Sequence, residues 1–156
     1  MEYEKYLEKG KTAIKESTIK QRIFAGVLLL ILLGIGIFLL NPEKKLLERR
    51  NSQRRSDVVN ILNAVYQYGV DNEGKLPQSI TNVPTMICQT GASSCDGLVD
   101  LSAVVEIEKK LLSEVPMDPK EKSLNGAGYQ ISKLSNGRIN VTAPLAENNA
   151  VISLSK

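Results

Sequence analysis

An uninterrupted apolar run of eighteen residues, Ile23–Leu40, constrains this chain more than any other feature. The run contains no charge, no amide and no proline. As an α-helix it would be about 27 Å long, close to the roughly 30 Å of a bilayer's hydrocarbon core. Lys20 and Arg22 precede it and Lys44 and Lys45 follow it, where long basic side chains can reach the headgroups. We therefore expect residues 23–40 to form a transmembrane helix in contact with membrane lipid.

Two other interpretations of the apolar run fit the sequence less well. A soluble core helix would need cover on every side, which a chain of 156 residues is too small to provide. A cleaved secretory signal would have a leader of 22 residues with four acids, and no small-x-small cleavage site follows Leu40. We expect the run to be retained as an anchor.

Charge is distributed unevenly around this anchor. Residues 1–22 carry a net charge of +2, residues 41–56 carry +4 and residues 57–156 carry −3. The acidic C-terminal region would repel phosphates, so we expect no nucleic-acid partner. Each side of the anchor has six Lys or Arg residues nearby, so charge alone does not orient it in the membrane.

The two cysteines, Cys88 and Cys95, bear on orientation. A disulfide across this short loop fits an oxidising compartment, whereas a reduced pair or half of a metal site fits the cytosol. With no histidine and no further cysteine, zinc lacks ligands. The disulfide interpretation places the C-terminal region outside the cytoplasm. Residues 1–22 then form a cytoplasmic tail, either a short helix on the inner membrane surface or a mobile segment.

A basic run, residues 41–56, follows the anchor. Either Pro42 kinks a continuing helix, or Asn41 caps a new helix with Pro42 in its first turn. The run favours a helix but has no broad apolar face, so we expect a solvated stalk or one covered by neighbouring subunits. Its densest basic cluster consists of four arginines: Arg49, Arg50, Arg54 and Arg55. They either form a solvated face of the stalk or bind anionic headgroups, a partner's acids or nucleic acid.

From residue 57 the pattern changes to apolar residues at spacings of three and four. The list is Val58, Ile61, Leu62, Val65 and Tyr66. This predicts an amphipathic helix that ends near Gly69. Residues 76–100 are rich in Thr, Ser, Gly, Asn and Pro and predict a long loop. Residues 101–112 predict a short helix, which the prolines of Val115–Pro119 stop.

The C-terminal segment alternates with period two. Residues 129–134 and 138–143 flank Asn136-Gly137, a strong hairpin signal, and residues 150–154 provide a third strand. Such a sheet needs a helix to cover its apolar face. We predict an α+β fold, in which a long N-terminal helix, half transmembrane and half amphipathic, packs on a small antiparallel sheet of about three strands. The globular domain is expected to be residues 57–156.

This order of segments resembles bacterial type IV pilin-like proteins and type II secretion pseudopilins. The similarity runs from about Leu40 to Lys156. It rests on Asn41-Pro42 with the basic run, Ser56–Pro77, Ile87–Cys95, Val115–Pro119 and Gly128–Glu147. The resemblance implies an inner-membrane subunit that is stacked through its N-terminal helix into a pilus or pseudopilus, with other pilin-like subunits and an assembly machinery as partners. Gly34 and Gly36 are then candidate helix contacts, since small residues let helices approach closely in membranes.

The N-terminal part departs from the family pattern. Prepilins carry a short basic leader, a Gly-Phe processing site and a Glu five residues into the mature helix. Here Phe24–Val27 lacks that order, and residues 23–40 contain no Glu. An intramembrane Glu is costly and in the family is thought to guide subunit docking. The alternative is therefore an unprocessed, permanently anchored accessory protein with a pilin-like head.

Site chemistry is sparse in this sequence. Some pseudopilins bind calcium after an Asp-Pro, and Asp118, Glu121 and Asn125 are weak candidates here, against an ordinary polar turn. A hydrolytic triad of the usual kind needs a histidine, which the chain lacks. We expect no enzyme and no cofactor.

Overall fold

The computed structural model describes residues 2–40 and 42–156. Two compact units divide the chain, Met1–Lys44 and Lys45–Lys156. We call the second unit the head. It combines helices with a small antiparallel sheet of four strands, so the predicted α+β class is confirmed.

The first unit is dominated by one helix, α1 (Glu2–Leu40). Its stretch Thr18–Gly36 is long and apolar enough to cross a membrane, and none of this stretch is buried. The helix begins well before the predicted anchor, so residues 2–22 are helical rather than a mobile tail. Large apolar side chains such as Leu30, 68% exposed, have no protein core to enter. A lipid environment is the one that suits them.

A second helix, α2 (Pro42–Asp71), begins at the proline, whose missing N–H is harmless in a first turn. The predicted cap residue, Asn41, lies outside the described residues. The helix continues two residues beyond the expected end at Gly69 and closes with a bond from Gly74 N to Gly69 O, 2.7 Å. Glu73 and Gly74 there adopt left-handed backbone angles of 56° and 82°.

The sheet has the order β1-β2-β3-β4, with every neighbouring pair antiparallel. Its strands are β1 (Thr85–Cys88), β2 (Gly126–Lys133), β3 (Ile139–Thr142) and β4 (Ser153–Ser155). The predicted hairpin is β2–β3, in register from Gln130↔Thr142 to Lys133↔Ile139. The predicted third strand is β4, which is shorter than expected.

Strand β1 corrects the prediction of an unbroken loop over residues 76–100. It pairs with β2 and buries Ile87 completely. Its other edge is covered in part by a parallel bridge between Ile87 and Val99. A short helix, α3 (Ser102–Ile107), follows and stops five residues before the predicted end.

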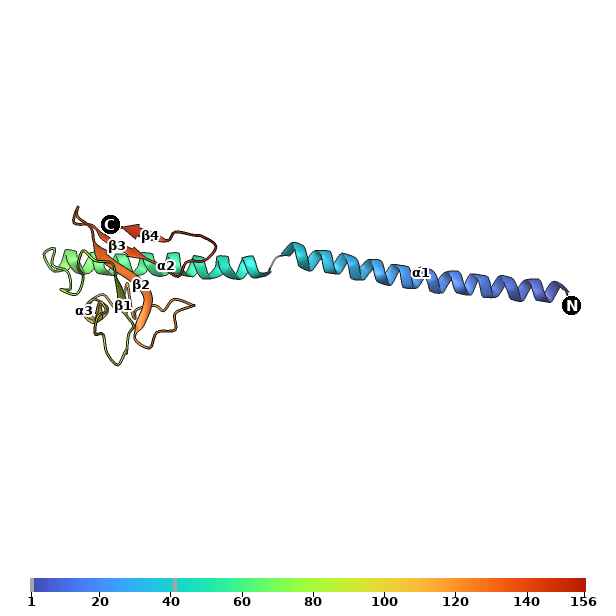
Figure 1. Cartoon of the computed structure of the whole chain (residues 1–156), viewed down its shortest axis with the longest axis horizontal. Coiled ribbons are helices and arrows are strands. Elements are labelled where there is room, and N and C mark those ends of the chain that lie inside the picture. Colours follow the sequence, from blue (N-terminus) through green and yellow to red (C-terminus); the bar gives the residue numbers. More distant parts are fainter. Residues whose placement is uncertain (1, 41) are drawn as a thin grey trace. The chain divides into compact units, whose positions relative to one another are not determined.

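The core lies where α2 meets the sheet (Figure 1). Buried residues of α2 recur at spacings of three and four, and they face buried positions of β2 and β3 such as Tyr129, Ile131 and Val141. The amphipathic part of α2 is therefore the element on which the head is built.

Candidate functional site

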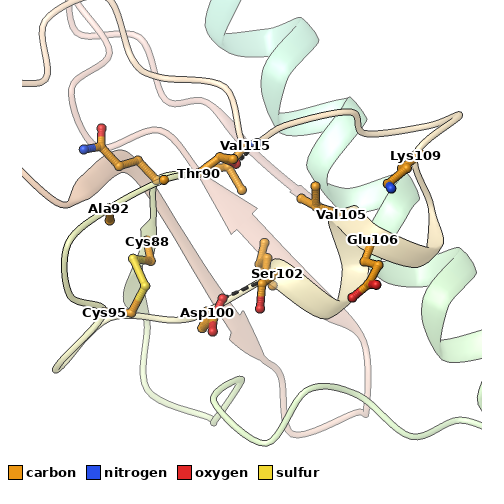
Figure 2. A pocket seen from close by; sticks show the side chains of 13 residues that line it. Cys88, Thr90, Ala92, Cys95, Asp100, Ser102, Val105, Glu106, Lys109 and Val115 are labelled. Carbon is orange, nitrogen blue, oxygen red and sulfur yellow. Dashed lines mark hydrogen bonds between the residues drawn. A yellow bond between two sulfur atoms is a disulfide. The ribbon is translucent and has the colours of Figure 1, made fainter.

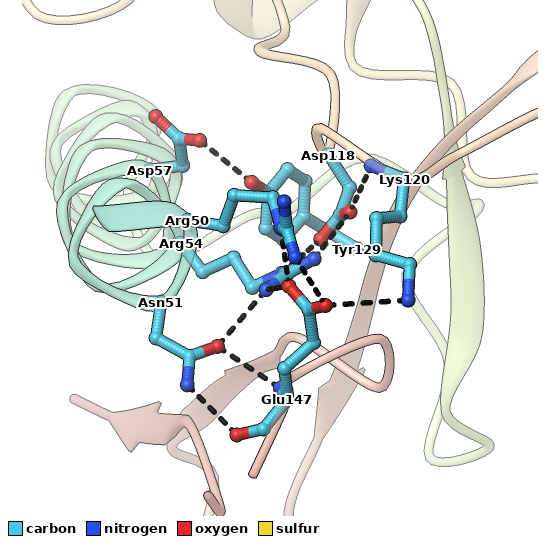
Figure 3. Close-up of polar contacts among 8 residues, drawn as sticks. All are labelled: Arg50, Asn51, Arg54, Asp57, Asp118, Lys120, Tyr129 and Glu147. Atoms are coloured by element: carbon cyan, nitrogen blue, oxygen red, sulfur yellow. Dashed lines mark hydrogen bonds and ion pairs between the residues drawn. The ribbon is translucent and has the colours of Figure 1, made fainter. Parts of the chain in front are cut away.

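A cluster of charged side chains joins α2 to two loops of the head (Figure 3). At its centre is Arg54, whose side chain is completely buried. Its Nε and Nη2 donate to Asp118 Oδ2 and Oδ1 at 2.6 and 3.0 Å, a two-pronged ion pair. Its Nη1 donates to Asn51 Oδ1 at 2.9 Å and to Glu147 Oε2 at 3.0 Å. The hydrogen bond to Asp118 raises the pKa of Arg54, so the guanidinium is charged under all ordinary conditions.

Glu147 fastens the loop between β3 and β4 to the same face of α2. Its carboxylate accepts from Arg50 Nε and Nη2 at 2.5 and 2.7 Å, and it lies 3.3 Å from Lys120 Nζ. Its backbone N donates to Asn51 Oδ1 and its backbone O accepts from Asn51 Nδ2, at 3.0 and 2.8 Å. Hydrogen bonding, first of all from Arg50, lowers the pKa of Glu147 to about 2. The loop is therefore held both by ion pairs and by hydrogen bonds between its backbone and the Asn51 side chain.

Asp57 and Tyr129 extend the cluster toward the core. The Tyr129 hydroxyl donates to Asp57 Oδ2 at 2.6 Å, and both residues are buried. Burial raises the pKa of Asp57, and it also raises the pKa of Tyr129. Among the residues that the structure describes, no buried side-chain N or O lacks a hydrogen-bond partner. Each buried polar atom of the cluster therefore has a protein partner, and the cluster fastens α2 to the loops of the head.

The four arginines of the basic run separate into two pairs. Arg50 and Arg54 point into the head, so their interpretation as part of a solvated stalk is wrong. Arg49 and Arg55 are exposed, as that interpretation predicted. The sequence did hold a signal, because Arg54 lies four residues before Val58 and therefore on the apolar face of the helix. The sequence did not single out the remaining members of the cluster, because most of their partners are too distant in sequence to be recognised: Asn51, Asp57, Lys120, Tyr129 and Glu147.

The candidate calcium residues, Asp118, Glu121 and Asn125, make hydrogen bonds to other groups of the head. Asp118 has both oxygens on Arg54, and its Oδ1 also accepts from the backbone N of Lys120 at 2.8 Å. Glu121 Oε1 accepts from the backbone of the two residues that follow it. Asn125 Oδ1 accepts from the hydroxyl of Ser93. No group of three or more His, Cys, Asp or Glu suited to a metal occurs in the described part of the chain. All three candidate side chains therefore already have hydrogen-bond partners within the head.

The predicted disulfide between Cys88 and Cys95 is present. It closes a loop that is bound to the calcium-candidate loop, since Gln89 N donates to Asn125 O at 2.8 Å. A hollow of about 430 Å³ lies between this loop and α3 (Figure 2). Two polar groups on its wall already accept hydrogen bonds from the backbone: Thr90 Oγ1 accepts from Val115 N, and Asp100 Oδ1 accepts from Ser102 N. Cys88 and Cys95 both line this hollow, so the disulfide forms part of its wall.

The candidate helix contacts in α1 are open. Nothing lies within 4 Å of the position that a Cβ would take on Gly34 or Gly36. Pro42 is exposed at the first residue of α2. The chain therefore has two features of interest, the apolar helix α1 in the first unit and the charged cluster in the second.

No protein-family model, curated protein or solved structure matches this chain.

Proposed function

We propose that this chain is a membrane-anchored, pilin-like structural subunit of a type IV pilus or of a type II secretion-like pseudopilus. The observation that carries the proposal is the succession of α1 and α2. The first helix contains an apolar stretch, Thr18–Gly36, that is long enough to span a membrane, and the second is the central element of a small α+β head. A subunit of this kind acts by packing its apolar helix against those of its neighbours while the head stays folded on its own.

Further support comes from the disulfide and the charged cluster. The bond between Cys88 and Cys95 suits an oxidising compartment, which supports an orientation with the head outside the cytoplasm and residues 1–22 inside it. Arg54, Asp118 and Glu147 fix α2 to the head, so that force applied to the helix reaches the sheet. Both features suit a subunit that bears load.

A second candidate function is that of a permanently anchored accessory protein. The observation that favours it is the absence of any charged residue in Ile23–Leu40, since pilins use an intramembrane Glu in docking. The head would then contact a partner at the cell surface without entering a fibre.

The two functions differ in where the chain is found and in what length. Mass and N-terminal sequence would be measured for the chain recovered from membranes and from sheared surface material. A subunit of a fibre is expected in the sheared fraction. A chain that keeps Met1 and stays wholly in the membrane fraction would contradict fibre assembly and favour the accessory protein.

Two glycine variants test the packing of α1. Gly34→Leu and Gly36→Leu should each reduce the amount of sheared fibre several-fold, because a larger side chain keeps helices apart. Ala25→Leu is the matched control, since it adds bulk to the same helix at a position not proposed as a contact. In all three variants the head should be as stable as in the parent chain. Fibre yields equal to that of the control would contradict a close-packed role for the glycines.

A further inference from the structure

Some basic residues of α2 form ion pairs inside the head, whereas others are exposed. The exposed ones define a basic surface on the helix. Arg50 and Arg54 are neutralised by Glu147 and Asp118 inside the head. Lys45 and Arg49 are exposed, and neither forms an ion pair with an acid of the described residues. The uncompensated charge of the basic run therefore lies on the outer face of the helix.

Helical geometry places these two residues together. Lys45 and Arg49 are four residues apart, which puts them on one face, and Ser52 and Ser56 continue that face without charge. At about 1.5 Å per residue, the two basic residues lie about 5 and 11 Å along α2 from Pro42. On this face the positive charge is thus confined to the part of α2 that directly follows the apolar run, whereas the exposed Arg55 lies on another side of the helix.

We infer that Lys45 and Arg49 bind the headgroups of anionic phospholipids. The headgroup layer is roughly 5 to 8 Å thick on each side of the hydrocarbon core. The Debye length at physiological salt adds about 8 Å of effective range. Both residues fall within this reach, and the chemistry that complements two uncompensated cations there is phosphate with a net negative charge. The inference rests on the membrane anchoring of the proposed function, but not on assembly into a fibre.

The test uses the whole chain, at one copy per lipid nanodisc. Discs of phosphatidylcholine alone are compared with discs that contain phosphatidylcholine and phosphatidylglycerol at three to one. The readout is amide hydrogen exchange of residues 43–50, a segment whose side chains are mostly exposed, so that its exchange reports local opening of the helix. Each basic residue near an anionic surface favours the bound state about fivefold, so exchange should slow by up to about 25-fold in the anionic discs. The effect should disappear in about 1 M salt, where the Debye length falls to about 3 Å.

Two double variants make the test specific. Lys45→Gln/Arg49→Gln should exchange equally fast in both kinds of disc. Lys109→Gln/Lys133→Gln removes the same charge from exposed positions elsewhere on the head and should keep the slowing. Equal exchange of the parent chain in both discs, or an equal loss in the two double variants, would overturn the inference. Slowing that needs two copies per disc would assign the face to a second chain instead, and slowing caused only by an added DNA duplex would assign it to nucleic acid. A chain that fails to enter the discs at all would instead contradict the membrane anchoring.

Discussion

The buried ion pair between Arg54 and Asp118 makes the sharpest prediction about the head. Both side chains are completely buried, and both Asp118 oxygens accept from the guanidinium. Asp118→Asn keeps the size of the side chain but leaves a buried cation without its main counter-charge. Breaking such a pair costs about 3 to 5 kcal/mol. Because Glu147 remains 3.0 Å from Arg54, we expect the lower end, about 3 kcal/mol.

Urea unfolding of the full chain in detergent micelles measures this loss. The midpoint of the head's transition, followed by circular dichroism, should fall while the slope with urea stays constant. Lys75→Gln is the control, since Lys75 and Glu73 form an ion pair with side chains that are 80% and 85% exposed. Removing that pair should cost less than about 1 kcal/mol.

A double variant separates the cost of an unpaired charge from the loss of packing. Arg54→Met/Asp118→Leu replaces the pair by apolar side chains, and such replacements are often neutral or stabilising. We expect it to be more stable than Asp118→Asn alone. The reasoning would be refuted if Asp118→Asn cost no more than Lys75→Gln, or if the double variant were as unstable as the single one.

Three other measurements probe neighbouring features of the head. The pKa of Glu147 is lowered from 4.5 to about 2, so its contribution is complete above about pH 5 and is lost as pH falls from about 4.5 to about 2; Glu147→Gln should flatten the pH dependence of the urea midpoint over that range. Reduction of Cys88–Cys95 should destabilise the head by about 2 to 3 kcal/mol, and a reductant should have no effect on a variant with serine at both positions. Gly128 and Gly137 share a backbone φ of 83°, but a Cβ on Gly128 would lie 2.6 Å from the Cβ of Asp118, whereas one on Gly137 would meet nothing within 4 Å. Gly137→Ala should therefore cost about 1 to 2 kcal/mol for its backbone conformation alone, and Gly128→Ala should lower the urea midpoint clearly further.

Features of the fold that depend on local chemistry could be predicted from the sequence. The turn at Asn136-Gly137 joins β2 and β3 because Gly137 adopts the left-handed conformation that the hairpin needs. The amphipathic part of α2 follows from spacings of three and four over residues 58–66. The apolar length of α1 is equally local, because it is a matter of composition over consecutive residues.

Strand β1 could not be predicted in the same way. Thr85–Cys88 is only four residues long and lies in a segment rich in Ser, Thr, Gly and Pro. It is a strand because Thr85 pairs with Ile131 and Cys88 with Gly126, residues far along the chain. An irregularity between Met86 and Cys88 further hides any alternation of its side chains. Strand formation here is decided by tertiary pairing and not by propensity.

Arg54 shows how charge and helical position compete as signals. Its charge suggests a solvated face, but its position, four and seven residues before Val58 and Ile61, suggests the core. Its partners lie 64 and 93 residues away, so no local pattern identifies them. The helical position decides the outcome, because α2 would have to rotate about its axis to expose Arg54. That rotation would also expose the apolar residues on the same face. A basic residue on the apolar face of a helix therefore predicts a buried acidic partner elsewhere in the chain. Here that partner is Asp118, which is buried.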